Sequence, residues 1–254
     1  MTTVTRRDAL RLLAMPVAIA AVGSVPLGAS RRARVRSPAR LKVLVAGGHP
    51  DDPESGCGGT IARYVDAGHA VTVLYLTRGE AGIEGKSHSE AARIRTAEAE
   101  RACGVLGATP RFGGQVDGDT HLDRAAYAAM RALLDEERPD VIFTHWPVDT
   151  HRDHRAVSLL IYDAWLGTGR SAALGYFEVL TGDQTQLFRP TDYVDISAVA
   201  QRKRDATFAH VSQKPGEWYP AHERMARFRG MEHGCEYAEA FVRHDDGPAL
   251  PLPG

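Results

Sequence analysis

Short apolar runs alternate with longer amphipathic segments along most of the chain, which predicts strands that alternate with helices. The apolar runs are rich in β-branched residues and stop at Gly, Pro or Asp. We expect strands at 41–46, 70–76, 111–113, 140–146, 176–180 and 192–196. We expect helices at 58–67, 87–106, 122–134, 154–166, 197–211 and 222–243. This order predicts an α/β fold, with a doubly wound, mostly parallel sheet and helices on both faces.

Polar residues follow the first predicted strand directly. The strand at 41–46 ends in Gly47-Gly48-His49-Pro50-Asp51-Asp52. One imidazole and two adjacent carboxylates therefore lie at the edge where open α/β sheets bind their ligands. His and Asp are also the ligands of hydrolytic metal sites, which keep one position open for water. The alternative is an ordinary strand-to-helix turn, with Asp as a cap and Pro as a breaker.

A second polar cluster follows the predicted strand at 140–146. His151-Arg152-Asp153-His154 opens the next helical segment. If the two strands are neighbours at the switch point of a doubly wound sheet, the two clusters converge. The alternative is that Thr150 and Asp153 form a capping box and that the histidines are exposed first-turn residues. Two independent clusters at one sheet edge favour a metal site over two unrelated turns.

The two clusters together resemble the signature of the PIG-L/LmbE-like metal-dependent N-deacetylases. Further segments match in family order over residues 41–243, namely Gly56-Cys57-Gly58-Gly59-Thr60, 76–82, the segment ending at Gly107, and 194–213. One departure is Pro53-Glu54, because many members carry an acidic residue directly after the paired Asp. The resemblance implies a Rossmann-like, LmbE-like fold. It also implies an enzyme that hydrolyses the N-acetyl group of an N-acetylglucosamine-containing substrate to a free amine and acetate.

The resemblance also implies roles for individual residues. His49, Asp52 and His154 would bind Zn²⁺, with Fe²⁺ as an alternative that the same donors accept. Asp51 would act as the general base that takes a proton from water. His151 would stabilise the oxyanion, and Asp153 would orient His151 and balance its charge. The proton donor to the leaving amine is either Asp51 or His151.

Two further residues are candidates for substrate binding. Arg78 follows the strand at 70–76 and resembles a substrate-contacting arginine of the family, although a surface ion pair explains it equally well. Asp117 lies in a glycine-rich loop and is a candidate for binding sugar hydroxyls, with a turn aspartate as the alternative. His210 falls in a family segment, and we expect it near the site and not in the reaction. The first motif and the N-terminal segment further resemble the glycopeptide-antibiotic pseudoaglycone deacetylases.

The N-terminal residues 1–30 predict a twin-arginine export signal. Arg6 and Arg7 precede a modest apolar stretch at 12–25, and Leu27-Gly28-Ala29 offers a cleavage site. The stretch is too short for a convincing membrane span, so we expect a secreted or extracytoplasmic protein. An uncleaved anchor or a start codon set too early are the alternatives. A basic linker at 31–40, one LmbE-like domain at 41–246 and a disordered Pro-rich tail at 247–254 complete the predicted organisation.

Composition narrows the function classes. The chain has 254 residues and a net charge of -1, which suits one soluble α/β domain and offers no basic excess for nucleic acid. Three cysteines exclude a fully paired disulfide framework, and we interpret Cys57 and Cys103 as packing residues. The chain lacks G-x-G-x-x-G after its first strand, which argues against a dinucleotide, and it lacks the G-x-S-x-G of serine hydrolases.

The expected partner is a small-molecule or glycoconjugate N-acetyl sugar. Two alternatives stay open on the sequence alone: a metal-dependent amidase or esterase that acts on a non-sugar substrate, and a non-catalytic, metal-containing sugar-binding protein. An unligated carboxylate at Asp51 argues against the binding protein, which has no use for one. The oligomeric state is not predicted.

Overall fold

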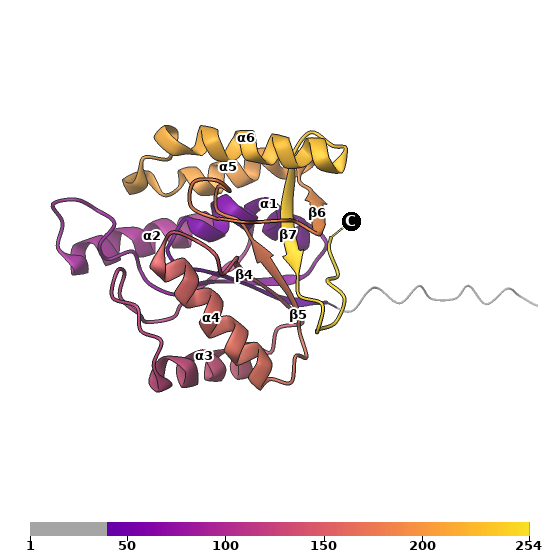
Figure 1. Ribbon diagram of the computed structural model, residues 1–254. Helices are drawn as coiled ribbons and strands as arrows, with labels where there is room; N and C mark the ends of the chain where they lie inside the picture. Colours follow the sequence, from indigo (N-terminus) through magenta and orange to yellow (C-terminus); the bar gives the residue numbers. More distant parts are fainter. Residues whose placement is uncertain (1–39, 254) are drawn as a thin grey trace, which may run out of the picture. The chain divides into compact units, whose positions relative to one another are not determined.

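The computed structural model describes residues 40–253, and a seven-stranded sheet forms the centre of this part of the chain (Figure 1). Its strand order is β3-β2-β1-β4-β5-β7-β6. The parallel strands are β1 (Lys42–Gly47), β2 (Ala70–Tyr75), β3 (Thr109–Phe112), β4 (Val141–His145) and β5 (Ala173–Phe177). The strand β7 (Ala238–Arg243) runs antiparallel to both of its neighbours, β5 and β6 (Asp192–Asp195). The predicted mostly parallel α/β sheet is confirmed.

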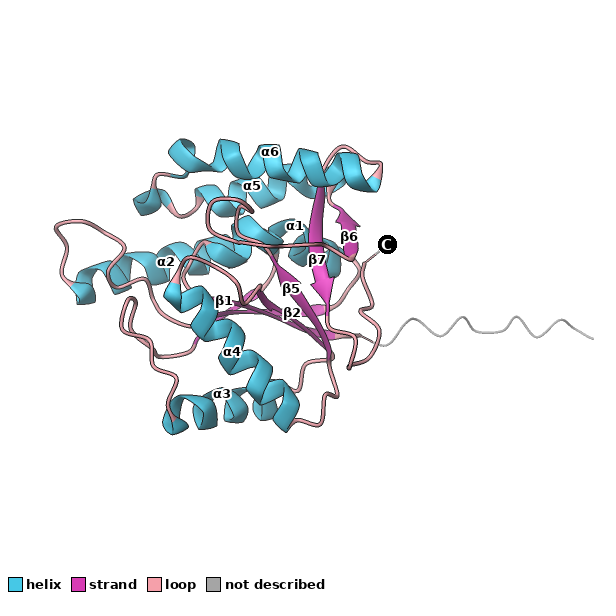
Figure 2. Cartoon of the chain, viewed as in Figure 1, coloured by secondary structure: helices cyan, strands magenta, loops and turns pink. Residues whose placement is uncertain are grey.

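Helices cover both faces of the sheet (Figure 2). One layer holds α1 (Asp52–Asp66), α2 (His88–Leu106), α5 (Ala200–Phe208) and α6 (Pro215–His233). The other layer holds α3 (Arg124–Glu137) and α4 (Arg152–Gly167). Two 3₁₀ turns, η1 (Ser197–Val199) and η2 (Val211–Gln213), flank α5. Alternate residues of β1 reach the two layers, because Val43 and Val45 pack with α1 and α2 whereas Leu44 and Ala46 pack with α3 and α4.

The pairing of β1 with β4 brings the two polar clusters together. Val43 lies opposite Val141 and Ala46 lies opposite Thr144, in parallel register. From β1 the chain moves outward to β2 and β3, and it then returns to add β4 and β5 on the other side of β1. The loops after β1 and β4 therefore flank the switch point, where ligands of such sheets bind.

The first helix starts earlier than predicted. Residues 52–57, which we expected to precede the predicted helix at 58–67, lie inside α1, which begins at Asp52. The glycines of α1 serve close packing, because a Cβ at Gly59 would lie 2.5 Å from Ile196 Cγ2 and one at Gly56 would lie 2.6 Å from Phe177 Cδ2. The composition suggested a loop, whereas tertiary packing selects small residues within a helix.

The C-terminal region differs most from expectation. The predicted helix at 222–243 is confirmed for residues 222–233 and wrong for the remainder. The helix α6 ends at His233, its C-cap Gly234 has a φ of 87°, and the chain continues as β7. The expected disorder of the tail is also wrong for residues 247–253. Leu250 is 8% exposed and belongs to the core, and the Pro251 carbonyl accepts a hydrogen bond from the Tyr64 hydroxyl at 2.8 Å.

Three further predictions concern the cysteines, the N-terminal segments and a membrane span. Cys57 and Cys103 are fully buried, as expected of packing residues. The export signal at 1–30 and nearly all of the basic linker at 31–40 lie outside the described residues. Within residues 40–253, none of the helices combines the length and the apolar character that crossing a membrane requires.

The packing of α1 is testable at Gly59. We expect Gly59→Ala to lower the free energy of unfolding by about 1–3 kcal/mol, because the new methyl group overpacks the contact with Ile196. Urea denaturation measures the change. Gly104 in α2 is the matched control, since it has open space around its Cα, and Gly104→Ala should raise stability by about 0.5–1 kcal/mol. Equal responses of the two variants would refute the packing argument.

Candidate metal centre

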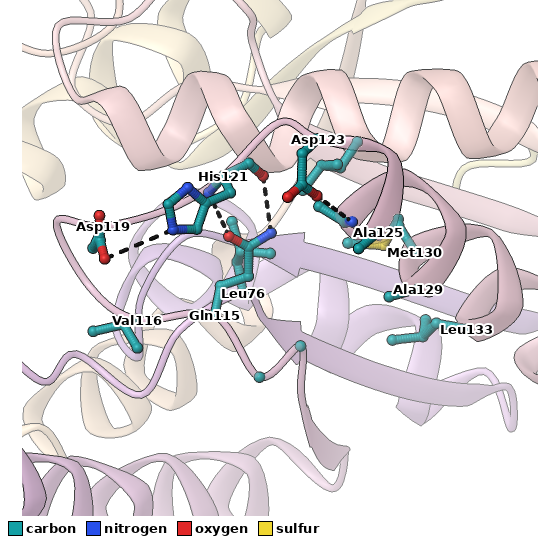
Figure 3. A pocket seen from close by; sticks show the side chains of 14 residues that line it. Leu76, Gln115, Val116, Asp119, His121, Asp123, Ala125, Ala129, Met130 and Leu133 are labelled. Atoms are coloured by element: carbon teal, nitrogen blue, oxygen red, sulfur yellow. Dashed lines mark hydrogen bonds and ion pairs between the residues drawn. The ribbon is translucent and has the colours of Figure 1, made fainter.

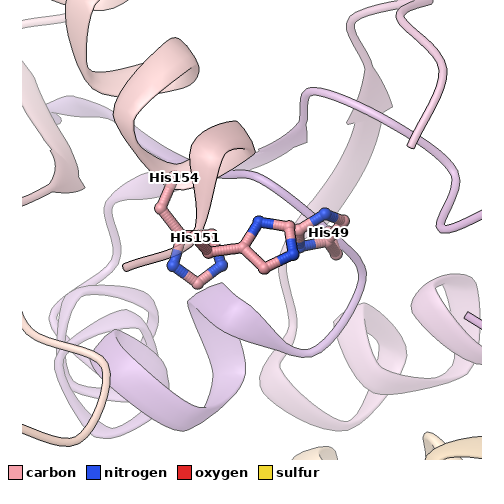
Figure 4. Close-up of side chains that lie close together, drawn as sticks. All are labelled: His49, His151 and His154. Carbon is pink, nitrogen blue, oxygen red and sulfur yellow. The ribbon is translucent and has the colours of Figure 1, made fainter. Parts of the chain in front are cut away.

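Three imidazole rings from two loops meet at the carboxyl edge of β1 and β4 (Figure 4). His49 comes from the turn after β1, and His151 and His154 come from the start of α4. The ring centroid of His49 lies 4.6 Å from that of His151 and 5.4 Å from that of His154. The predicted convergence of the two motifs is therefore observed.

The carboxylate of Asp52 lies between two of these rings. Its Oδ2 atom is 3.1 Å from His49 Nδ1 and 3.2 Å from His154 Nε2. Ligand atoms of a tetrahedral zinc ion lie about 3.3 Å apart, because each is about 2.0–2.1 Å from the metal. The two observed separations match that spacing. Two groups of donor atoms around Asp52 lie close enough together to hold a metal ion, namely His49 with His151 and His154, and Asp52 with His145 and His154. A side chain at position 48 would intrude, since a Cβ at Gly48 would lie 3.0 Å from the His154 ring.

Each of the two ligand histidines contacts a second carboxylate through its other ring nitrogen. His49 Nε2 lies 3.1 Å from Asp153 Oδ2, and His154 Nδ1 lies 3.1 Å from Asp149 Oδ1. Metal-binding histidines commonly donate their second N–H to a carboxylate, which fixes the tautomer and orients the ring. Here this arrangement leaves His49 Nδ1 and His154 Nε2 directed at Asp52.

The carboxylate of Asp52 and the imidazole of His154 each stabilise the charged form of the other. Burial opposes ionisation of Asp52, but His154, His145 and His49 outweigh it and hold the pKa of Asp52 well below its usual value. Burial also disfavours the His154 imidazolium, yet Asp52 and Asp149 raise its pKa to about 9. A site whose carboxylates favour protonated histidines also favours a metal cation, which would replace those protons.

His145 is a member of this cluster that the sequence did not reveal. Its ring stacks on His154 with centroids 4.0 Å apart, and it is fully buried. The Gly48 N–H donates to His145 Nε2 at 3.1 Å, which occupies that lone pair. Burial and the neighbouring His154 lower the pKa of His145 to about 4, so it is neutral. His145 therefore supports the backbone of the first motif. Its Nε2 atom also lies 3.5 Å from Asp52 Oδ2, and His145 forms a group of possible metal donors with Asp52 and His154.

Asp51 stands beside the ligands without joining them. Its Oδ2 atom accepts a hydrogen bond from Arg95 Nη2 at 2.9 Å, and the same guanidinium group donates to the Pro50 carbonyl. Burial raises the pKa of Asp51 to about 6, although the charge of Arg95 opposes the shift. Arg95 was not predicted, because a cation on an amphipathic helix is usually solvated, whereas this one is 3% exposed.

Glycines make room for Arg95. A Cβ at Gly79 would lie 2.3 Å from Arg95 Nη1, and one at Gly82 would lie 2.4 Å from the same atom. The loop after β2 therefore passes directly over the guanidinium group. In the family segment at 76–82, Gly79 and Gly82 are therefore positions where a side chain would collide with Arg95.

The hydrogen bonds found for the Asp153 carboxylate do not include the expected contact with the His151 ring, although its charge opposes the burial that lowers the pKa of His151. The carboxylate accepts hydrogen bonds from Thr120 Oγ1 at 2.6 Å and from the Gly118 N–H at 2.9 Å, and it contacts His49. His151 instead caps α4, because its Nδ1 accepts from the Asp153 backbone N–H at 3.3 Å. The neutral His151 ring therefore carries its proton on Nε2.

The two predicted substrate residues have different outcomes. Asp117 reaches the centre, with Oδ1 3.2 Å from His49 Nε2. The guanidinium group of Arg78 turns to α2 and β3, where it donates to Thr96 Oγ1 at 2.8 Å and lies 4.2 Å from the centroid of Phe112. The contacts found for Arg78 among the described residues do not include the two motifs.

A cavity of about 370 Å³ lies next to the loop that carries Asp117 (Figure 3). Its floor comes from apolar side chains of α3 and α4, including Ala126, Met130 and Leu160. Its rim includes Gln115 and His121, which hydrogen-bond to each other through side chain and backbone. The same loop therefore contacts the metal centre on one side and this cavity on the other.

Comparisons with known proteins agree with this site. Residues 44–165 match the family model "PIG-L: GlcNAc-PI de-N-acetylase". The chain is 32% identical to the diacetylchitobiose deacetylase of Thermococcus kodakarensis over 217 residues, which are 78% of this chain and 81% of the relative. The N,N'-diacetylchitobiose deacetylase of Pyrococcus horikoshii has a similar structure, with a TM-score of 0.73 and 27% identity over 81% of this chain and 84% of that one.

A more distant structure shares the fold. The A40926 pseudoaglycone deacetylase superposes with a TM-score of 0.65 at 20% identity, covering 80% of this chain and 96% of that chain. At this identity the likeness shows the architecture alone. The family model covers both motifs, since its match runs from residue 44 to residue 165. The chain belongs to the PIG-L family of de-N-acetylases.

Proposed function

We propose that the protein is a zinc-dependent hydrolase that removes the N-acetyl group from an N-acetylglucosamine-containing substrate. One observation carries this proposal: two histidines and one carboxylate converge in ligand spacing, and Asp51 lies beside them with its carboxylate outside the ligand set. The curated relatives support the reaction class, since they are named as deacetylases of acetylated amino sugars.

His49, Asp52 and His154 would hold the metal. A zinc ion at this site polarises the acetyl carbonyl and lowers the pKa of water. The donor set also accepts Fe²⁺, so the metal itself is part of the proposal. The outer contacts from Asp153 and Asp149 keep both rings aligned for this role.

The remaining residues then divide the proton transfers. Asp51 accepts a proton from water as the water oxygen bonds to the acetyl carbon. The His151 Nε2–H donates to the oxygen that becomes negative in the tetrahedral intermediate. When the C–N bond breaks, Asp51 returns its proton to the leaving nitrogen. The products are acetate and a free amine, and the chain itself forms no covalent intermediate.

Asp117 is the residue that we retain for sugar binding. Its backbone and carboxylate are held by the loop after β2, through the Glu80 side chain and the Ala81 N–H. It therefore presents a fixed acceptor at the rim of the centre. Arg78 is withdrawn from this role because its guanidinium group contacts Thr96 and Phe112.

The reaction is testable at Asp51. We expect Asp51→Asn to lower kcat for acetate release from N-acetylglucosamine conjugates by about 10²–10⁴-fold, because the general base is lost. Zinc should still bind stoichiometrically, since the three ligands are intact. Asp66→Asn is the matched control, because Asp66 is a carboxylate at the other end of α1 that pairs with Arg202.

Three outcomes separate the alternatives. Metal-dependent acetate release that depends on Asp51 supports the proposal. Release only from acetylated compounds without a sugar would favour the non-sugar amidase or esterase. Sugar binding that Asp51→Asn leaves unchanged, without turnover of any conjugate, would favour the binding protein.

The outer carboxylate of His154 gives a second test. Asp149→Asn removes the charge that orients the His154 ring, so we expect zinc affinity to fall by about 10–100-fold. Competition with a chelator measures the affinity. Asp163→Asn provides the control, since Asp163 is an exposed carboxylate on the same helix. An unchanged affinity in Asp149→Asn would argue against His154 as a ligand.

We further propose that the protein acts outside the cytoplasm, on the basis of the twin arginine and the apolar segment at 12–25. Replacement of Arg6 and Arg7 by lysine should retain the protein in the cytoplasm, as measured by cell fractionation. Replacement of Arg31 and Arg32 by lysine is the control and should leave export intact. Equal export of both variants would refute the signal.

A further inference from the structure

The backbone of Asp51 adopts a conformation that L-amino acids rarely use. Its φ is 113° and its ψ is -30°. Non-glycine residues persist in such regions only when surrounding contacts determine them. Asp51 is also the N-cap of α1, where backbone N–H groups have no partner inside the helix. Some other group must therefore hold this residue in place.

Glu54 supplies that contact. Its Oε2 atom accepts a hydrogen bond from the Asp51 N–H at 3.2 Å. Glu54 occupies the third position of α1, from which a carboxylate reaches back to the N-cap amide. The acidic residue that stands one position later than the family pattern thus acts on Asp51 directly.

The carboxylate of Glu54 is itself held by buried side chains. It is 0% exposed, and its Oε1 atom accepts a hydrogen bond from the Tyr75 hydroxyl and lies 3.2 Å from His210 Nε2. Tyr75 and His210 are also fully buried. A buried carboxylate requires such partners, and here the Tyr75 hydroxyl supplies the hydrogen bond while the His210 ring lies alongside.

The segment that carries His210 is anchored as well. Ser212 donates from its backbone N–H at 2.8 Å and from its hydroxyl at 2.6 Å to the Glu98 carboxylate of α2. The same helix carries Arg95, which holds the Asp51 side chain. The Asp51 N–H is therefore held by the Glu54 side chain, whereas the Asp51 carboxylate is held by Arg95 and by the Glu54 backbone in the capping box.

From this geometry we infer that Glu54, fixed by Tyr75 and His210, is a positioning residue for the general base. It holds the Asp51 backbone in its strained conformation, so that the Asp51 carboxylate faces the reaction and does not turn toward the metal ligands. This inference rests on the proposed function for the role of Asp51. A purely structural helix cap is the competing explanation.

A pair of variants of nearly equal volume separates the two explanations. Glu54→Met removes the acceptor, whereas Glu54→Gln keeps an oxygen that can accept from the Asp51 N–H. We expect Glu54→Met to lower kcat by about tenfold to hundredfold, with KM and zinc content unchanged, because the base is misplaced. Glu54→Gln should restore kcat to near the wild-type value. In an Asp51→Asn background, Glu54→Met should have no further effect on kcat.

Glu239, a residue of β7 that contacts the same helix α1, offers a matched control. It is a buried carboxylate that accepts from the Gly59 and Thr60 N–H groups of α1 and pairs with Lys203. Glu239→Gln should lower the Tm and leave kcat unchanged. A Glu54→Met enzyme with unchanged kcat, or one that loses zinc in proportion to kcat, would overturn the inference.

Hydrogen exchange of the wild-type, zinc-loaded protein tests the contact independently of turnover and of variant folding. The Asp51 amide should exchange slowly, like the amides inside α1, because Glu54 accepts its hydrogen. Exchange at the rate of an unprotected amide would overturn the inference even if the enzyme is active. Slow exchange in a protein without deacetylase activity would retain the contact and refute the proposed function alone.

Discussion

The parallel pairing of β1 with β4 is the constraint on which the site depends. Both strands are buried and run in the same direction, so their carboxyl ends meet at one edge. This places His49 and His154 in one cluster although more than a hundred residues separate them in sequence. The contacts that set this register are apolar, including Val45 opposite Phe143. The metal centre is therefore positioned by the hydrophobic core and not by its own polar contacts.

Burial of the site imposes a second requirement, because each buried carboxylate needs a partner group. Asp52, Asp149 and Asp153 are all less than a tenth exposed, and each contacts an imidazole. A carboxylate buried without such a partner would cost several kcal/mol, on the order of the total stability margin of many domains. The same pairing that makes burial tolerable fixes the ring tautomers. Ligand geometry and folding stability are thus satisfied by one set of contacts.

The sequence predicted the parts of this structure that short patterns encode. Apolar runs located the strands, and the positions of His49 and His154 after two of those strands indicated where they would meet. Patterns failed where a distant contact decides the outcome. The sequence pattern predicts that Arg95 is a surface residue, whereas in the structure the loop at Gly79 covers its guanidinium group. Asp153 follows His151 by two positions in the chain, yet its carboxylate accepts a hydrogen bond from Thr120 and contacts His49. The helical periodicity near residue 240 gave way to strand pairing with β5 and β6.

The position of β7 has a consequence for how the chain reaches its final form. This strand lies between β5 and β6 and is the last of the seven in sequence. Until Ala238–Arg243 leaves the ribosome, β5 and β6 each present an unpaired edge, and unpaired edges invite association with other chains. Synthesis that stops shortly before this strand would therefore yield a protein with both metal motifs and an open sheet.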